Sequence, residues 1–140
     1  MTQLSAISFC LAFPIVDATL NFVIGHPEPM PLPHDIEAEI YFLPPEHGGR
    51  SSFAFSGYRP QFYYEGRDWD APHEYPDVEK VNPGEKVRAY LGFLSPQEHI
   101  GRVYPGMPFL VREGNRTVGY GVVKKILDLE KSAANAVQNK

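Results

Sequence analysis

The sequence predicts an all-β protein, and three observations support this prediction. Hydrophobic residues make up 43% of the 140 residues and aromatic residues 13%, which is enough for a core of one domain. Fourteen prolines and 12 glycines break the chain into segments that are too short for long helices. Several segments place apolar residues at every second position, as in a strand with one buried face. About six such strands indicate an antiparallel barrel or sandwich, and a closed barrel would leave no exposed strand edge.

The first 33 residues are expected to form an apolar, strand-rich extension that ends in a proline-rich connector. We expect short strands at residues 7–9 and 20–24, because these segments are apolar. Exposed strands of this kind could pair with a second copy of the chain and form a homo-oligomer. Prolines at every second position then predict an extended connector that lacks backbone donors at these positions. These residues are Pro27, Pro29, Pro31 and Pro33.

Residues 4–16 are apolar enough to suggest the core of a signal peptide. They have no basic start and no convincing small-residue cleavage site after them. They are also shorter than the roughly 20 apolar residues that span a bilayer. We therefore expect no membrane association and a cytoplasmic location. The single cysteine, Cys10, excludes a disulfide within the chain and a cysteine-based zinc cluster.

The body of the protein is expected at residues 34–127. Residues 36–42 and 87–93 alternate apolar and polar side chains most clearly, and both are predicted strands. Four further predicted strands lie at residues 52–55, 61–64, 109–112 and 117–127. Turn residues at 47–49, 82–84 and 113–115 separate these strands. The polar tail, residues 128–140, is expected to form a frayed helix or to be disordered.

The charge of the chain limits its partners. It has 13 Lys and Arg residues against 17 Asp and Glu residues, a formal net charge of −4. Proteins that bind nucleic acid without specificity usually carry a basic excess, so general RNA or DNA coating is not expected. A local basic patch is still compatible with this balance.

No standard catalytic motif is present in the sequence, and we expect neither a cofactor nor enzymatic activity. A phosphate-binding P-loop, a dinucleotide-binding glycine motif and a G-x-S-x-G nucleophile motif are all missing. The richest polar run is 67–77, where Asp68, Asp70, His73 and Glu74 are residue types that can ligate a metal. Their spacing matches no known ligand motif, so we expect a solvent-exposed loop between two strands, with Trp69 folded over it. A metal-dependent enzyme that uses Asp68, Asp70 and His73 is the weakest alternative.

The body resembles the C-terminal (third) domain of elongation factor Tu. Two motifs carry most of the resemblance, G-Y-R-P-Q-F-Y at residues 57–63 and R-E-G-N-R-T-V-G-Y-G-V-V at residues 112–123. Shorter matches occur at residues 33–34, 37–41, 48–50 and 82–85. The resemblance implies a six-stranded antiparallel closed β-barrel over residues 34–127, with an N-terminal extension and a polar tail on either side.

The resemblance also implies a function without catalysis. In this family the barrel contacts the T-stem of aminoacyl-tRNA, the nucleotide-exchange factor and the GTPase domain, and no GTPase domain is found in these 140 residues. We therefore do not expect this chain to deliver tRNA with GTP hydrolysis by itself. The positions that match family residues at or beside the tRNA surface are Arg50, Gln61, Arg112, Glu113 and Gly114. Two neighbouring positions depart from the family, which commonly has histidine in place of Ser51 and threonine in place of Asp70.

Two functions from different classes follow. The first is a binding module linked to translation, with tRNA or a factor as its partner. The second is a protein-interaction mimic, such as a regulator or an immunity protein, which captures a partner of elongation factor Tu. The acidic net charge and Asp70 favour the second, and the retained Arg50, Gln61 and Arg112 favour the first.

Overall fold

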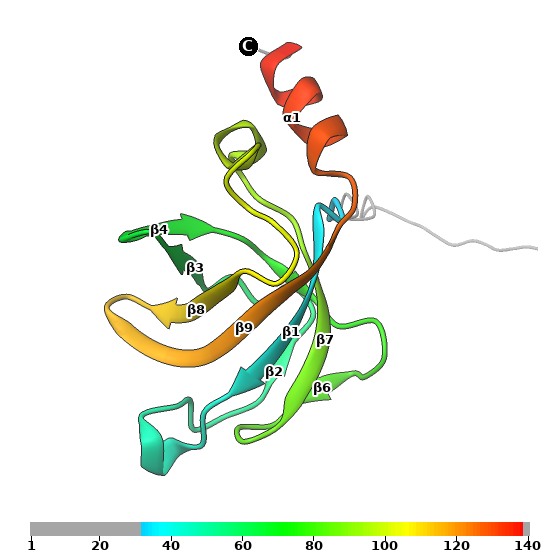
Figure 1. Cartoon of the computed structure of the whole chain (residues 1–140). Coiled ribbons are helices and arrows are strands. Elements are labelled where there is room, and N and C mark those ends of the chain that lie inside the picture. Colours follow the sequence, from blue (N-terminus) through cyan, green and yellow to red (C-terminus); the bar gives the residue numbers. More distant parts are fainter. Residues whose placement is uncertain (1–31, 139–140) are drawn as a thin grey trace, which may run out of the picture. The chain divides into compact units, whose positions relative to one another are not determined.

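In this computed structural model the described residues are 32–138, and they are mostly strands (Figure 1). The longer strands are β1 (Ile36–Phe42), β3 (Gln61–Tyr64), β4 (Arg67–Asp70), β7 (Lys86–Leu91), β8 (Pro108–Glu113) and β9 (Arg116–Ile126). The short strands are β2 (Ala54–Phe55), β5 (His73–Glu74) and β6 (Lys80–Val81). The described residues also contain two 3-10 helices, η1 (Pro45–His47) and η2 (Pro96–His99), and one α-helix, α1 (Leu129–Gln138). The strands predicted at residues 7–9 and 20–24 lie outside the described residues, as does their pairing with a second copy.

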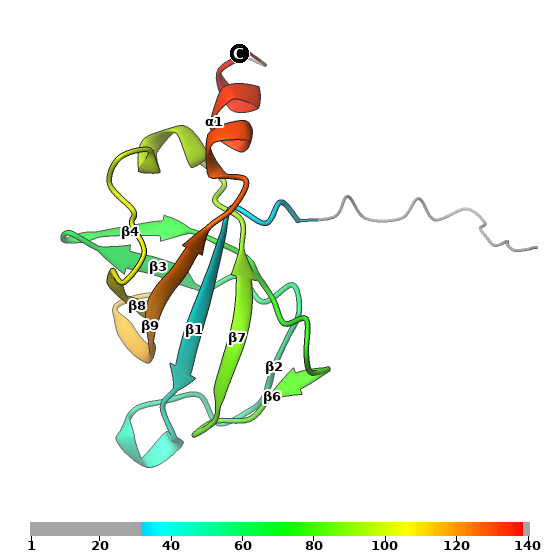
Figure 2. The ribbon, with the colours of Figure 1, turned by 45° about the vertical axis from the view of Figure 1, so that its right-hand side comes forward.

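Seven of the strands form one sheet in the order β4-β3-β8-β9-β1-β7-β5, and every neighbouring pair is antiparallel (Figures 1 and 2). The two outer strands, β4 and β5, are parts of one bent segment, residues 67–74. Its first half pairs with β3, and its second half pairs with β7. Between them the amide of Gly92 donates to the Pro72 carbonyl (3.3 Å) and that of Leu94 donates to the Asp70 carbonyl (3.2 Å). Counted with this segment as one strand, the sheet is the predicted six-stranded closed barrel.

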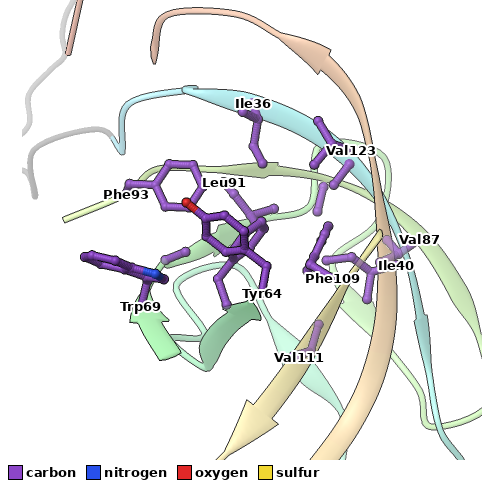
Figure 3. Packing of buried hydrophobic residues seen from close by; sticks show 14 of the residues in the cluster. Ile36, Ile40, Tyr64, Trp69, Val87, Leu91, Phe93, Phe109, Val111 and Val123 are labelled. Carbon is purple, nitrogen blue, oxygen red and sulfur yellow. The ribbon is translucent and has the colours of Figure 1, made fainter. Parts of the chain in front are cut away.

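The interior of the barrel is filled by the alternate residues of its strands. In β1 the inward residues Ile36, Ala38, Ile40 and Phe42 are buried, and the residues between them face outward. Figure 3 shows the buried side chains of strands on different sides of the barrel packed together, with Phe109 near Val111 and Ile40. The Phe109 ring also stacks on Phe62, with centroids 4.1 Å apart. In β1 the period-two pattern therefore predicted both the strand and its buried face correctly.

The polar run at 67–77 is not a solvent-exposed loop, and that prediction was wrong. Residues 67–70 and 73–74 are strands, and Trp69 is only 8% exposed. Trp69, His73 and Tyr75 are buried at odd-numbered positions, so the period of two continues through this run. The acidic residues between them face outward. Closure of the barrel requires this segment, because it pairs with both β3 and β7.

The tail forms helix α1, which packs against η2 and is attached to the barrel through Asp35. The Ser132 hydroxyl donates to one oxygen of the buried Asp35 carboxyl, and the Phe93 amide donates to the other at 2.8 Å. Burial raises the pKa of Asp35 despite these two hydrogen bonds. Leu129 and Ala133 supply the buried face of the helix.

Candidate functional site

Four of the five predicted site residues lie on β3, on β8 or in the turn that follows β8. Gln61 in β3 is paired directly with Arg112 in β8, and Glu113 and Gly114 follow at the turn into β9. Directly paired residues share a face of an antiparallel sheet, so Gln61 and Arg112 both face outward. A cavity of about 260 Å³ lies here. Its lining residues are Tyr58, Arg59, Pro60, Gln61, Arg112, Glu113 and Gly114.

Gly114 makes the backbone of this turn accessible. Its φ of +61° is a conformation that side chains disfavour, and a Cβ at this position would meet no atom within 4 Å. The turn therefore presents backbone to the solvent at the edge of the cavity. Another molecule can approach it closely.

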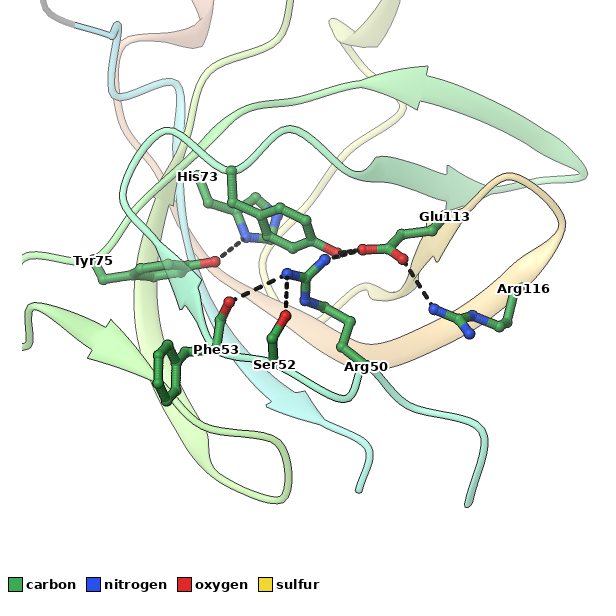
Figure 4. Close-up of polar contacts among 8 residues, drawn as sticks. Arg50, Ser52, Phe53, His73, Tyr75, Glu113 and Arg116 are labelled. Carbon is green, nitrogen blue, oxygen red and sulfur yellow. Dashed lines mark hydrogen bonds and ion pairs between the residues drawn. The ribbon is translucent and has the colours of Figure 1, made fainter. Parts of the chain in front are cut away.

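The fifth residue, Arg50, reaches the site through Glu113 (Figure 4). Its guanidinium forms an ion pair with one oxygen of the Glu113 carboxylate, which also accepts a hydrogen bond from the Tyr58 hydroxyl at 2.5 Å. The other carboxylate oxygen accepts from Arg116 at 3.0 Å. Arg50 also donates to the carbonyl of Phe53 at 3.2 Å. Arg50 and Glu113 thus join the loop before β2 to the β8–β9 turn.

Contacts within this cluster favour the charged forms of Glu113 and Arg50. Partial burial alone would raise the pKa of Glu113, but hydrogen bonds from Tyr58 and Arg50 outweigh it and lower that pKa. Burial would likewise lower the pKa of Arg50, and the hydrogen bond with Glu113 reverses the direction. Burial and the Glu113 carboxylate together raise the pKa of the Tyr58 hydroxyl. At neutral pH the cluster therefore holds a carboxylate between two guanidinium groups.

Carboxylates from β4 lie beside the other two polar residues of the site. Gln61 donates from its amide nitrogen to Asp70 at 2.7 Å. The Nε atom of Arg112 lies 3.6 Å from an oxygen of Asp68, and its guanidinium stacks over the Tyr63 ring at 4.3 Å. Asp68 was not predicted to belong to this site. Its outward position follows only once residues 67–70 are recognised as a strand that pairs with β3.

The structure separates the three residues of the metal hypothesis. Asp68 and Asp70 face outward on β4, whereas His73 is only 2% exposed and faces the core, where its Nδ1 atom lies 2.9 Å from the Tyr75 hydroxyl. Burial lowers the pKa of His73 to about 3. Within residues 32–138 no three His, Cys, Asp or Glu side chains come together as a metal site would require.

Comparison with protein families identifies the barrel. A family model described as the elongation factor Tu C-terminal domain matches residues 30–127. The chain belongs to this family. The match spans the whole barrel, from before β1 to the end of β9, and it confirms the resemblance carried by the two motifs.

Membership of the elongation factor Tu C-terminal domain family supports a coarse function, a translation-factor-like binding module on a β-barrel. The site described above lies on this barrel, at the ends of β3 and β8 and at the turn into β9. In the part of the chain from residue 32 to residue 138, no helix is both long and apolar enough to cross a membrane.

Proposed function

We propose that this protein is a cytoplasmic, non-catalytic module that binds the stem of a tRNA. The single observation that carries the proposal is the direct pairing of Gln61 with Arg112 beside the accessible Gly114 turn. A guanidinium can pair with phosphate, an amide can hydrogen-bond a ribose hydroxyl, and a glycine backbone permits close approach. These three groups line one cavity on the outside of the barrel.

Each residue has a different expected role. Arg112 supplies the positive charge, and its stacking on Tyr63 fixes the plane of the guanidinium. Gln61 supplies a donor and an acceptor that distinguish RNA from DNA through the 2′-hydroxyl. Arg50 and Glu113 join the loop before β2 to the turn that borders the cavity, so their role is chiefly to position the turn.

A binding assay with a salt series tests this proposal. Purified protein is titrated with tRNA, and the dissociation constant is measured between 50 and 200 mM salt, a range of roughly fourfold in concentration. We expect binding tighter than the non-specific range of about 10⁻⁴–10⁻⁶ M at physiological salt. Arg112→Ala should weaken binding about tenfold and lower the salt slope by about one.

Arg88→Ala is the matched control for this assay. Arg88 lies on β7 and forms an ion pair with Asp77, and it does not line the cavity. Its replacement by alanine changes the net charge by the same amount as Arg112→Ala. If Arg88→Ala weakens tRNA binding as much as Arg112→Ala, the proposed site is wrong. Binding that stays within the non-specific range would exclude tRNA as the partner.

A protein partner is the second candidate, and one observation favours it. The guanidinium of Arg50 is occupied by Glu113, and the chain as a whole carries a net charge of −4. A surface with paired charges suits a protein partner with complementary charges better than a polyanion. Calorimetry with purified elongation factor Tu and with its exchange factor tests this candidate directly. Absence of binding to both proteins would exclude elongation factor Tu and its exchange factor as the partner.

A further inference from the structure

The outward face of β3, β4 and β8 places two carboxylates in the same cross-strand rows as the polar residues of the site. One row runs from Asp70 through Gln61 to Arg112. The next row runs from Asp68 through Tyr63 to Leu110 on β8. Neighbours in such rows lie within side-chain contact, so the acidic pair on β4 lies beside Gln61 and Arg112, two of the residues that line the cavity.

The contact of Asp68 with Arg112 is an ion pair without a hydrogen bond. The atoms Asp68 Oδ1 and Arg112 Nε lie 3.6 Å apart, and each is buried without a hydrogen-bond partner in the described part of the chain. A phosphate that binds Arg112 must therefore come close to a carboxylate that already faces the guanidinium. Asp70 holds the Gln61 amide by a shorter contact of 2.7 Å.

We infer that Asp68 and Asp70 are specificity-determining residues that lower the affinity of this face for phosphate. The inference rests on the proposed tRNA-binding function. The two carboxylates compete with phosphate for Arg112 and Gln61, and they repel any further phosphate that approaches the cavity. Binding is then restricted to an RNA whose shape matches the face, because sequence-independent attraction to phosphate is largely cancelled.

Charge removal at constant shape tests the inference. The double variant Asp68→Asn with Asp70→Asn is titrated with tRNA and with single-stranded poly(U) at several salt concentrations. We expect poly(U) to bind about tenfold tighter than to the unmodified protein, with a salt slope steeper by about one. Binding of tRNA should tighten less, so the ratio of the two affinities falls. Thermal unfolding of each variant checks that the barrel is intact.

The control variant removes two charges elsewhere. Glu79→Gln with Glu130→Gln neutralises two exposed carboxylates that lie outside the ion pairs of the described residues. This variant should change poly(U) binding by less than about twofold. Adding Arg112→Ala to the Asp68→Asn variant should remove the gain, because the freed guanidinium is then missing.

The outcomes separate the inference from the proposed function. If the unmodified protein binds tRNA and the Asp68/Asp70 variant gains nothing, the inference is overturned and the function stands. If only the variant binds RNA, the carboxylates act as inferred and the function proposed for the unmodified protein is wrong. If neither binds RNA, both are overturned. An equal gain in the control variant also overturns the inference, since the effect would then come from net charge alone.

Discussion

The Glu113 carboxylate contacts three side chains. It forms ion pairs with Arg50 and Arg116 and accepts a hydrogen bond from the Tyr58 hydroxyl. Arg50 and Tyr58 lie more than 50 residues from Glu113 in the sequence, which is why the pairing of Glu113 with Arg50 was not predicted from the sequence. A group that satisfies several charged partners at once is expected to matter for stability, because its loss leaves those partners unpaired.

Replacement of Glu113 by glutamine should destabilise the protein by about 1.5–3 kcal/mol, the usual value of hydrogen bonds to charged groups. The reason is that a neutral amide leaves the Arg50 guanidinium without its counter-charge. Urea denaturation at pH 7 measures the change in the free energy of unfolding. Glu39→Gln is the matched control, since Glu39 is exposed and lies 3.9 Å from Lys124, and it should cost less than about 0.5 kcal/mol. Equal losses in both variants would contradict this prediction.

The residues of the candidate face show what the sequence could and could not predict. Arg50, Gln61, Arg112, Glu113 and Gly114 were predicted through the family resemblance, and the structure brings them to one surface. Their use of internal partners was not predictable, because it depends on contacts between strands that are distant in the sequence.

At the scale of secondary structure, most strands were predictable from alternation alone. β1 and β7 alternate apolar and polar side chains, and burial follows the same alternation. The segment 67–74 was missed because its buried residues are an indole, a small side chain and an imidazole, set between charged residues and prolines. Composition suggested a loop, whereas the partner strands β3 and β7 impose an extended conformation.

Two glycines of the β8–β9 hairpin should respond differently to substitution by alanine. At Gly121 a Cβ would lie 2.2 Å from Cζ of Phe109, whose ring is 3% exposed and stacked on Phe62. Gly121→Ala should therefore cost about 1–3 kcal/mol through overpacking. Gly114→Ala has free space but a φ of +61°, so it should cost about 1 kcal/mol.

Urea unfolding of the two glycine variants measures this difference. A lower midpoint for Gly121→Ala than for Gly114→Ala is expected. The addition of Phe109→Leu to Gly121→Ala should recover part of the loss, because it provides room for the new methyl group. A larger loss for Gly114→Ala would show that backbone conformation, and not packing, limits this hairpin.

At the scale of the whole barrel, two buried histidines link stability to pH. His73 and His99 are both buried among aromatic rings. Burial lowers the pKa of His73 to about 3, and burial together with the charge of Arg102 lowers the pKa of His99 to about 4. In the unfolded chain a histidine has a pKa of about 6.5, so the unfolded state binds more protons between these values.

The free energy of unfolding should therefore be highest above about pH 6.5 and fall as the pH is lowered toward 4. Each histidine contributes a slope of about 1.4 kcal/mol per pH unit in the middle of this window. Urea unfolding at four pH values between about 4.5 and 7.5 measures the slope. His73→Gln, which does not titrate, should reduce the slope by about half. An unchanged free energy across this range would contradict the predicted protonation of these histidines on unfolding.

Closure of the barrel depends on one short stretch of backbone, because residues 70–73 carry the chain from its ladder with β3 to its ladder with β7. Proteolytic cleavage within this stretch would cut the one strand that is shared by both ladders, whereas cleavage at a hairpin turn leaves every strand whole. The cut would allow the cylinder to open and would expose unpaired amides and carbonyls on two edges. Such edges pair readily with other chains, so nicking at this point would convert the folded protein into a species prone to aggregation.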